Sequence, residues 1–169
     1  MSIIHCASMS TGKDSVATAV LALETQPRES IRIAFADTGN EHELVYEHLD
    51  YLEGVLGLPI HRLRASFAME IARKSEYVLK HWSRKGVPDV DIERALKALV
   101  PTGNPYLDLC IWKGRFPSRT NQFCTQFLKT EPLMDYQLGL IEQGLCEAVW
   151  AWQGVRLDES QSRRTRLQG

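Results

Sequence analysis

The N-terminal part of the chain alternates short apolar runs with segments of helical periodicity, and this alternation restricts the fold more than any other feature. Apolar runs at residues 2–7, 31–36 and 59–63 are separated by helix-like segments at residues 14–24 and 43–56. A strand–helix–strand order of this kind predicts a parallel sheet covered by helices. In such sheets ligands bind beyond the carboxyl ends of the strands.

The rest of the chain is predicted to be mostly helical before one more strand. The expected elements are helices at residues 67–84 and 90–99, a loop at 101–105, a basic, turn-rich segment at 112–119, a mostly helical stretch at 121–143 that is interrupted or restarted near Pro132, and a strand at 147–152. We therefore expect a single domain over residues 1–169, with a helical insertion at about 66–112.

Composition and charge are those of a soluble globular protein. Hydrophobic residues make up 44% and charged residues 24% of the 169 residues, and the formal net charge is −1. This balance gives no overall electrostatic argument for a nucleic-acid or membrane partner. No apolar run approaches the ~18 residues of a membrane span. The four cysteines form no C-x-x-C pair, and no signal peptide is recognised, so we expect a cytoplasmic protein with reduced thiols.

The polar corner after the first expected strand has the composition of an anion-binding loop. It reads Ser8-Met9-Ser10-Thr11-Gly12-Lys13-Asp14-Ser15 and leads directly into the first expected helix. Exposed amides at a helix start, a glycine, several hydroxyls and a lysine together suit a phosphate group. A plain helix start capped by Ser10 or Thr11 is the structural alternative. A Walker A loop fits poorly, because Ala7 stands where its first glycine belongs and Asp14 follows the lysine.

Residues 10–15 closely resemble the S-G-G-K-D-S signature of the PP-loop, with Thr11 in place of the first glycine. Three further segments resemble the phosphoadenosine phosphosulfate reductase family of the PP-loop, adenine nucleotide alpha-hydrolase-like superfamily. These segments are residues 35–41 (Phe-Ala-Asp-Thr-Gly-Asn-Glu), residues 115–119 with 123–125 and 128–129, and residues 154–160 with Arg163. The four segments occur in the order of the family and cover nearly the whole chain.

This resemblance implies an α/β, Rossmann-like three-layer sandwich with a mostly parallel sheet that binds an adenine nucleotide. The catalytic residues that it implies, together with the chemistry of the side chains, are Lys13, Asp14, Arg156 and Cys124. The implied nucleotide-binding residues are Ser8, Ser10, Thr11, Gly12, Lys13, Asp14, Ser15, Asp37, Thr38, Gly39, Arg115, Arg119, Gly154, Arg156 and Arg163. The arginines are included because a guanidinium fork suits phosphate and sulfate oxygens.

The nucleotide is expected to be ATP with Mg²⁺ or phosphoadenosine phosphosulfate. The Lys13-Asp14-Ser15 ending resembles the ATP-using members of the superfamily, in which pyrophosphate leaves and an adenylated substrate forms. Asp14 or Asp37 would hold the Mg²⁺, directly or through water. For both acids a purely structural role, at the first turn of a helix or in a turn after a strand, stays open.

Two other functions stay open. The first is a sulfonucleotide reductase or sulfotransferase-like enzyme. The resemblance implies that such reductases carry their nucleophilic cysteine in a Glu-Cys-Gly-Leu-His segment. This chain has no such segment, and the residues around Cys146 stand in a different order. Cys124 is then the candidate nucleophile, because nearby cations would favour its thiolate; a half-buried helix cysteine is the alternative. The second is a nucleotide-binding subunit without chemistry of its own. The acceptor is undetermined, with a nucleic acid among the candidates, and a homo-oligomer is compatible with the sequence.

Overall fold

The protein is described by a computed structural model that covers residues 2–154 of the chain. It divides into two compact units, each described here by itself. The described part of the first, the sheet unit, consists of residues 2–35, 42–62 and 135–154. The second, the helical unit, consists of residues 36–41 and 63–134.

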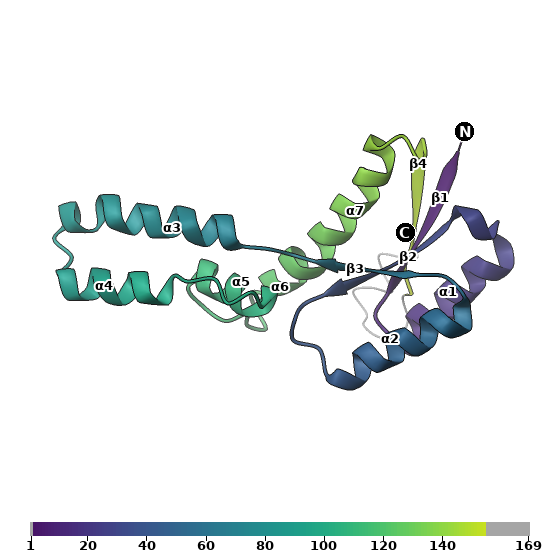
Figure 1. Ribbon diagram of the computed structural model, residues 1–169, viewed down its shortest axis with the longest axis horizontal. Helices are drawn as coiled ribbons and strands as arrows, with labels where there is room; N and C mark the ends of the chain where they lie inside the picture. The colour runs from purple at the N-terminus through teal and green to yellow at the C-terminus, as the bar shows by residue number, and fades with distance from the viewer. Residues whose placement is uncertain (1, 155–169) are drawn as a thin grey trace. The chain divides into compact units, whose positions relative to one another are not determined.

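The strands form one four-stranded sheet in the order β3-β2-β1-β4 (Figure 1). The strands are β1 (Ile3–Met9), β2 (Ile31–Asp37), β3 (Ile60–Arg64) and β4 (Ala148–Trp152). All run parallel; β1 pairs with β2 from His5–Ile31 to Met9–Phe35, and with β4 from Ile3–Ala148 to Ala7–Trp152. The parallel sheet predicted from the alternation is therefore confirmed.

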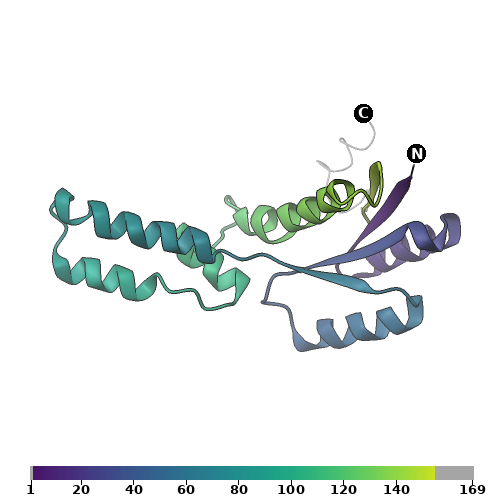
Figure 2. The same ribbon diagram turned by 45° about the horizontal axis from the view of Figure 1, so that its top comes forward.

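Helices α1 (Lys13–Thr25) and α2 (Glu43–Leu56) cover one face of the sheet, and α7 (Glu131–Glu142) covers the other (Figure 2). Successive residues of a strand point to opposite faces. Thus Ala7 and Met9 of β1 pack with α1 and α2, whereas Ile4 packs with Leu140 of α7. The first core is completed by Ala19, Ala22, Ile31, Ile33, Phe35, Leu49, Leu52, Leu56 and Ile60. This gives the predicted three layers.

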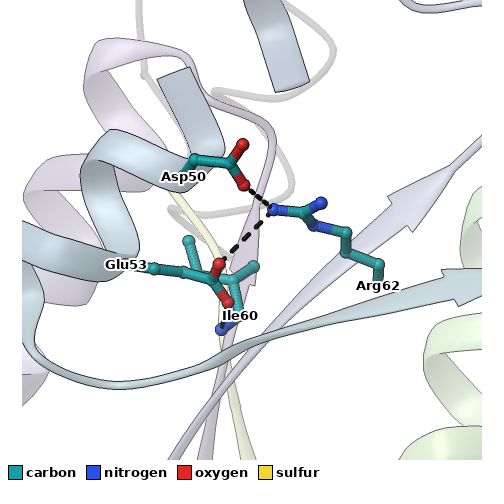
Figure 3. Close-up of polar contacts among 4 residues, drawn as sticks. All are labelled: Asp50, Glu53, Ile60 and Arg62. Carbon is teal, nitrogen blue, oxygen red and sulfur yellow. Dashed lines mark hydrogen bonds and ion pairs between the residues drawn. The ribbon is translucent and has the colours of Figure 1, made fainter. Parts of the chain in front are cut away.

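The connection from α2 to β3 is fixed by one carboxylate (Figure 3). Helix α2 ends at Gly57, whose φ of 62° lies in the left-handed region that favours glycine. The Oε1 atom of Glu53 then accepts a hydrogen bond from the amide of Ile60 at 2.6 Å. Arg62 lies beside the same carboxylate and also pairs with Asp50. These contacts hold the start of β3 against the helix that precedes it.

The helical unit contains several helices and a small apolar core. Its helices are α3 (Ala68–His81), a 3₁₀ turn (Ser83–Lys85), α4 (Asp89–Ala98), α5 (Pro105–Lys113) and α6 (Phe123–Thr125), followed by a π-helical segment (Gln126–Thr130) that leads into α7. The core lies at the start of α3 and along the segment from α5 to the π-helical segment, and it is formed by Phe67, Leu109, Phe123 and Leu128. The helices expected at residues 67–84 and 90–99 are thus confirmed, with small shifts at their ends.

One helix of the helical unit was not predicted. Helix α5 begins at the last residue of the expected loop at 101–105, runs through residues 106–111, for which no element was predicted, and ends inside the expected turn-rich segment at 112–119. Pro105 does not break this helix but begins it, because the first helical position needs no amide donor, and Asn104 accepts a hydrogen bond from the amide of Leu107 at 3.1 Å. The expected restart near Pro132 is observed, because α7 begins at Glu131, one residue before the proline. The π-helical segment directly before it widens the turn where proline cannot donate a hydrogen bond.

Within the described residues, no helix combines the length and the apolar character needed to cross a membrane.

The joint between α2 and β3 yields the first prediction. We expect Glu53→Ala to lower the free energy of unfolding by about 1–2 kcal/mol, because it leaves the amide of the buried Ile60 without its acceptor. Asp50→Ala removes only an exposed ion pair with Arg62 and should cost less than about 0.5 kcal/mol. Urea denaturation of both variants measures the difference. Equal losses would show that the ion pair, and not the bond to the backbone, holds β3.

Candidate functional site

The loop between β1 and α1 is held together by the hydroxyl of Ser15. This hydroxyl donates to the carbonyl of Gly12 at 2.8 Å and accepts from the amide of Ser10 at 3.1 Å. The hydroxyl of Ser10 lies 3.2 Å from the same oxygen. Ser15 is buried, so its hydroxyl closes the loop from within. Its predicted contact with a phosphate stays a prediction.

The backbone of this loop has the conformation that a glycine-rich loop would take. Thr11 has a φ of 60°, and among the described residues it is the sole non-glycine with a positive φ. A β-branched residue at such an angle is strained. Gly12, with φ −75° and ψ 153°, is the N-cap of α1, and it has no side chain to accept bonds from the first helical turn. The helix is therefore not capped by Ser10 or Thr11, and its start keeps the character of an anion site.

The charged residues of the loop lie at the first turn of α1. Lys13 is exposed, and Asp14 is half-buried in the next position. Ser8 lies at the carboxyl end of β1, and its hydroxyl is buried with no hydrogen-bond partner in the described part of the chain. An unsatisfied buried hydroxyl costs free energy. A phosphate oxygen or a water near the loop would supply a partner.

The loop lies at the topological switch point of the sheet, where the order of the strands reverses. From β1 the chain moves to β2 and β3 on one side, and it returns to place β4 on the other side. The carboxyl ends of β1 and β4 are thus neighbours, and ligands of parallel sheets bind at such a switch point. Gly154, two residues after β4, lies against the loop: a Cβ on it would stand 2.6 Å from the carbonyl oxygen of Asp14 and 3.0 Å from the amide nitrogen of Ser15.

The two tryptophans of β4 differ in exposure, and both contact His5 of β1. The indole of Trp152 is half-buried, and its Nε1 donates to Nδ1 of His5 on the paired strand at 3.0 Å. This bond ties β4 to β1 close to the loop. Trp150 is 57% exposed, and its ring lies edge-on to that of His5.

The second predicted corner, after β2, belongs to the helical unit. The carboxylate of Asp37 accepts the amide of Gly39 at 2.8 Å, and the buried Thr38 donates its hydroxyl to Glu41 at 2.8 Å. Gly39 has a φ of 72°, and a Cβ on it would stand 2.6 Å from Cδ of Pro105. The glycine is required both by the angle and by the contact.

Sequence reasoning missed the residues that hold this corner. The side-chain amide of Asn104 donates to the carbonyl of Gly39 at 2.6 Å, and the amide of Tyr106 donates to the carbonyl of Thr38 at 3.1 Å. The buried carboxylate of Asp108 in turn accepts the amides of the loop that precedes α5, at 2.6 Å from Thr102. An Asn-Pro pair at a helix start was the signal that could have found Asn104.

The remaining predicted residues belong to the helical unit or lie outside the described residues. Arg115 and Arg119 are exposed in the loop after α5 of the helical unit. Arg156 and Arg163 lie outside the described residues.

All four cysteines are free thiols. Cys124 is half-buried, whereas Cys6, Cys110 and Cys146 are buried. Burial raises the pKa of the thiols of Cys6 and Cys110, so both are poor nucleophiles at neutral pH.

The carboxylates expected to bind Mg²⁺ are not part of a larger cluster of metal-binding side chains within the described residues. In the range that the structure describes, no group of three or more His, Cys, Asp or Glu side chains is placed to hold a metal ion. Mg²⁺ is commonly bound by one or two carboxylates together with the phosphates of a substrate. A single carboxylate, at Asp14 or at Asp37, is compatible with a Mg²⁺ ion that is bound together with a nucleotide. It is not enough for a Mg²⁺ site made by the protein's side chains alone.

More than half of the chain matches one known protein family. The family described as phosphoadenosine phosphosulfate reductase domain matches residues 4–102. The chain belongs to this family. The match contains the loop of residues 10–15 and the corner of residues 37–40, and the resemblance to this family is confirmed. The two later segments, at residues 115–129 and 154–163, lie outside the matched residues.

A curated relative extends the similarity along nearly the whole chain. The chain is 42% identical over 172 aligned positions to the "Uncharacterized 37.8 kDa protein in gpa 5'region" of Escherichia phage 186. The alignment covers 96% of this chain and 50% of the relative, so the chain spans about half the length of the protein that it matches.

Gly154 yields a prediction for this member of the family. We expect Gly154→Ala to lower the free energy of unfolding by about 1–3 kcal/mol, because its Cβ would overlap the backbone of Asp14. Gly54→Ala is the matched control: no atom lies within 4 Å of its Cβ, and alanine in helix α2 should stabilise by about 0.5–1 kcal/mol. Thermal unfolding compares the two. A neutral Gly154→Ala would mean that β4 does not end against the loop.

Thr11 yields a second prediction. Thr11→Gly should raise the free energy of unfolding by about 1 kcal/mol, because it releases the strain of a φ of 60°. Thr11→Val keeps the β-branched shape and the strain but removes the hydroxyl, so it should bring no gain. Denaturant titration of both variants is the measurement. A valine variant that gains as much as the glycine variant would show that the hydroxyl, and not the backbone angle, is costly.

Proposed function

We propose that this chain binds an adenine nucleotide with its phosphates at the loop between β1 and α1. One observation carries the proposal: a strand leads through a left-handed residue into a helix that begins at Gly12 without a side-chain cap, at the switch point of a parallel sheet. The amides and the partial positive charge of that helix start attract phosphate. Lys13 adds a full charge at the first turn.

We further propose that the nucleotide is ATP and that the reaction is adenylyl transfer. An acceptor oxygen would attack the α-phosphorus, the bond from that phosphorus to the bridging oxygen would break, and pyrophosphate would leave with the bond electrons. Lys13 would neutralise the charge that develops on the leaving group. Mg²⁺ carried by the nucleotide would supply Lewis-acid stabilisation of the same oxygens.

A sulfonucleotide reductase is the second candidate, and the family match favours it. The matched family is described by that activity. The chain, however, has no Glu-Cys-Gly-Leu-His segment. The remaining candidate nucleophile is Cys124 of the helical unit, which is half-buried, whereas the other three cysteines are buried. A sulfonate transfer to Cys124 would need that thiol as its thiolate.

Calorimetry separates the two candidates. ATP and 3′-phosphoadenosine 5′-phosphate are titrated into the protein, each with and without Mg²⁺. We expect ATP with Mg²⁺ to bind more tightly, and Lys13→Ala to weaken it about 10-fold or more, because a charge-assisted contact to phosphate is lost. Lys80→Ala removes an exposed lysine that pairs with Glu76 on α3 and serves as the control.

The outcomes are distinct. Tighter binding of the bisphosphate nucleotide would favour the reductase. Binding that is equal in wild type and Lys13→Ala would contradict a phosphate site at this loop. Release of pyrophosphate from ATP in the presence of an acceptor supports adenylyl transfer, and tight binding without any turnover would instead indicate a nucleotide-binding subunit.

A further inference from the structure

The helical unit carries an excess of positive charge that the rest of the chain does not share. Residues 36–41 and 63–134 contain twelve Lys and Arg against nine Asp and Glu, whereas the whole chain has a formal net charge of −1. The excess is concentrated between Asp108 and Glu131. That stretch contains no acidic residue and four cations, which are Lys113, Arg115, Arg119 and Lys129.

Two of these four cations, Lys113 and Arg115, lie over aromatic rings. The ammonium of Lys113 lies 3.6 Å from the ring centroid of Trp112 and 3.9 Å from that of Phe127. The guanidinium of Arg115 lies 5.7 Å from the centroid of Phe123. Because Lys113 and Arg115 each rest on a ring, these two side chains lose less conformational freedom when they meet an anion.

The cations are also close enough to affect one another. Burial, followed by the attraction of Glu131 and the opposing repulsion of Arg115, sets the pKa of Lys113, and the net result is a pKa below its ordinary value. Lys74 adds a further positive charge, since its ammonium donates to the carbonyl of Trp112 at 2.7 Å at the end of α5. Clustered like charges repel, and a polyanion would relieve that repulsion.

The loop after α5 displays an aromatic ring among these charges. Helix α5 ends at Gly114, and Phe116, two residues on, is 70% exposed. A short turn follows, in which Ser118 and Asn121 exchange backbone hydrogen bonds of 3.1 Å. Arg119 stands within this turn and is exposed. An exposed ring between two arginines offers a stacking surface for a base and contacts for the neighbouring phosphates.

We propose that the surface formed by Lys113, Arg115, Phe116 and Arg119 binds single-stranded nucleic acid. Positive charge that follows the backbone, combined with an exposed aromatic ring that stacks on bases, is how proteins bind single strands without sequence preference. Duplex nucleic acid would offer the charges but not the bases. The inference rests on the proposed function for its role, because the bound strand would be the acceptor in adenylyl transfer.

Fluorescence anisotropy tests binding directly, without ATP. The probe is a fluorescein-labelled oligothymidylate of about 16 nucleotides. We expect Phe116→Ala to weaken binding about 10-fold or more, and Phe116→Trp to keep it, because stacking on the ring is lost in the first and preserved in the second. Arg119→Ala should reduce the slope of log affinity against log salt by about one.

Matched controls come from the same unit. Leu79 on α3 is 60% exposed, and Leu79→Ala removes an apolar side chain of comparable accessibility to Phe116. The side chain of Arg94 on α4 is 79% exposed, and Arg94→Ala removes a cation outside the surface. Both variants should bind the oligonucleotide like the wild type, and thermal unfolding verifies that all variants are folded.

Three results would overturn the inference. If Phe116→Ala binds the oligonucleotide as tightly as the wild type does, non-specific charge attraction would explain the binding without base stacking. A duplex of the same length that binds as tightly would exclude base stacking. Polyglutamate that displaces the oligonucleotide at equal charge concentration would indicate an acidic protein partner instead. Calorimetry of Phe116→Ala with ATP keeps the two proposals apart. Loss of oligonucleotide binding with unchanged ATP binding would concern this surface alone. Oligonucleotide binding by a protein that does not bind ATP would count against the nucleotide site alone.

Discussion

The ligand edge of the sheet unit depends on the close approach of two backbone segments, the one that follows β4 and the first turn of α1. Gly154 lies so near the carbonyl of Asp14 that a side chain could not be placed between them. This contact is possible because β4 pairs in parallel with β1, which brings the carboxyl ends of the two strands to the same edge. The start of α1 is therefore bordered by a second strand end, and a phosphate bound there would meet backbone on more than one side.

The loop between β1 and α1 has internal hydrogen bonds that close it and also polar groups that lack a hydrogen-bond partner within the described residues. Ser15 uses its hydroxyl to close the turn, and Thr11 is held at a backbone angle that its own side chain disfavours. Meanwhile Gly12 provides no cap, and the hydroxyl of Ser8 has no partner within the described part. Strain of this kind persists only where the surroundings determine the conformation, and it is common at ligand sites. A strained residue, an uncapped helix start and an unpaired buried hydroxyl therefore occur within one short segment of the described chain, residues 8–12.

The fold could be predicted from the sequence because its signals are local. Apolar runs of strand length alternate with helical periodicity, and each polar corner follows a strand, so the parallel sheet and its ligand edge follow from pattern alone. The roles within the site could not be predicted in the same way. Ser15 reads as a phosphate donor in the sequence, yet its hydroxyl bonds depend on the path of the loop. Asn104 is 65 residues from Gly39, and no local pattern connects them.

Helix α5 shows why the contact between Asn104 and Gly39 was not predicted from the sequence, and what that contact does. Its sequence begins with proline, which reads as a break, and its N-cap Asn104 serves both the helix and the corner at Gly39. Its other end carries Lys113, and Lys74 binds the final carbonyls there. Nine residues span about 13 Å at 1.5 Å per residue. Within the helical unit, one short rigid element therefore sets the distance between the corner after β2 and the cationic, aromatic surface, and a strand held on that surface would lie at a fixed distance from Asp37.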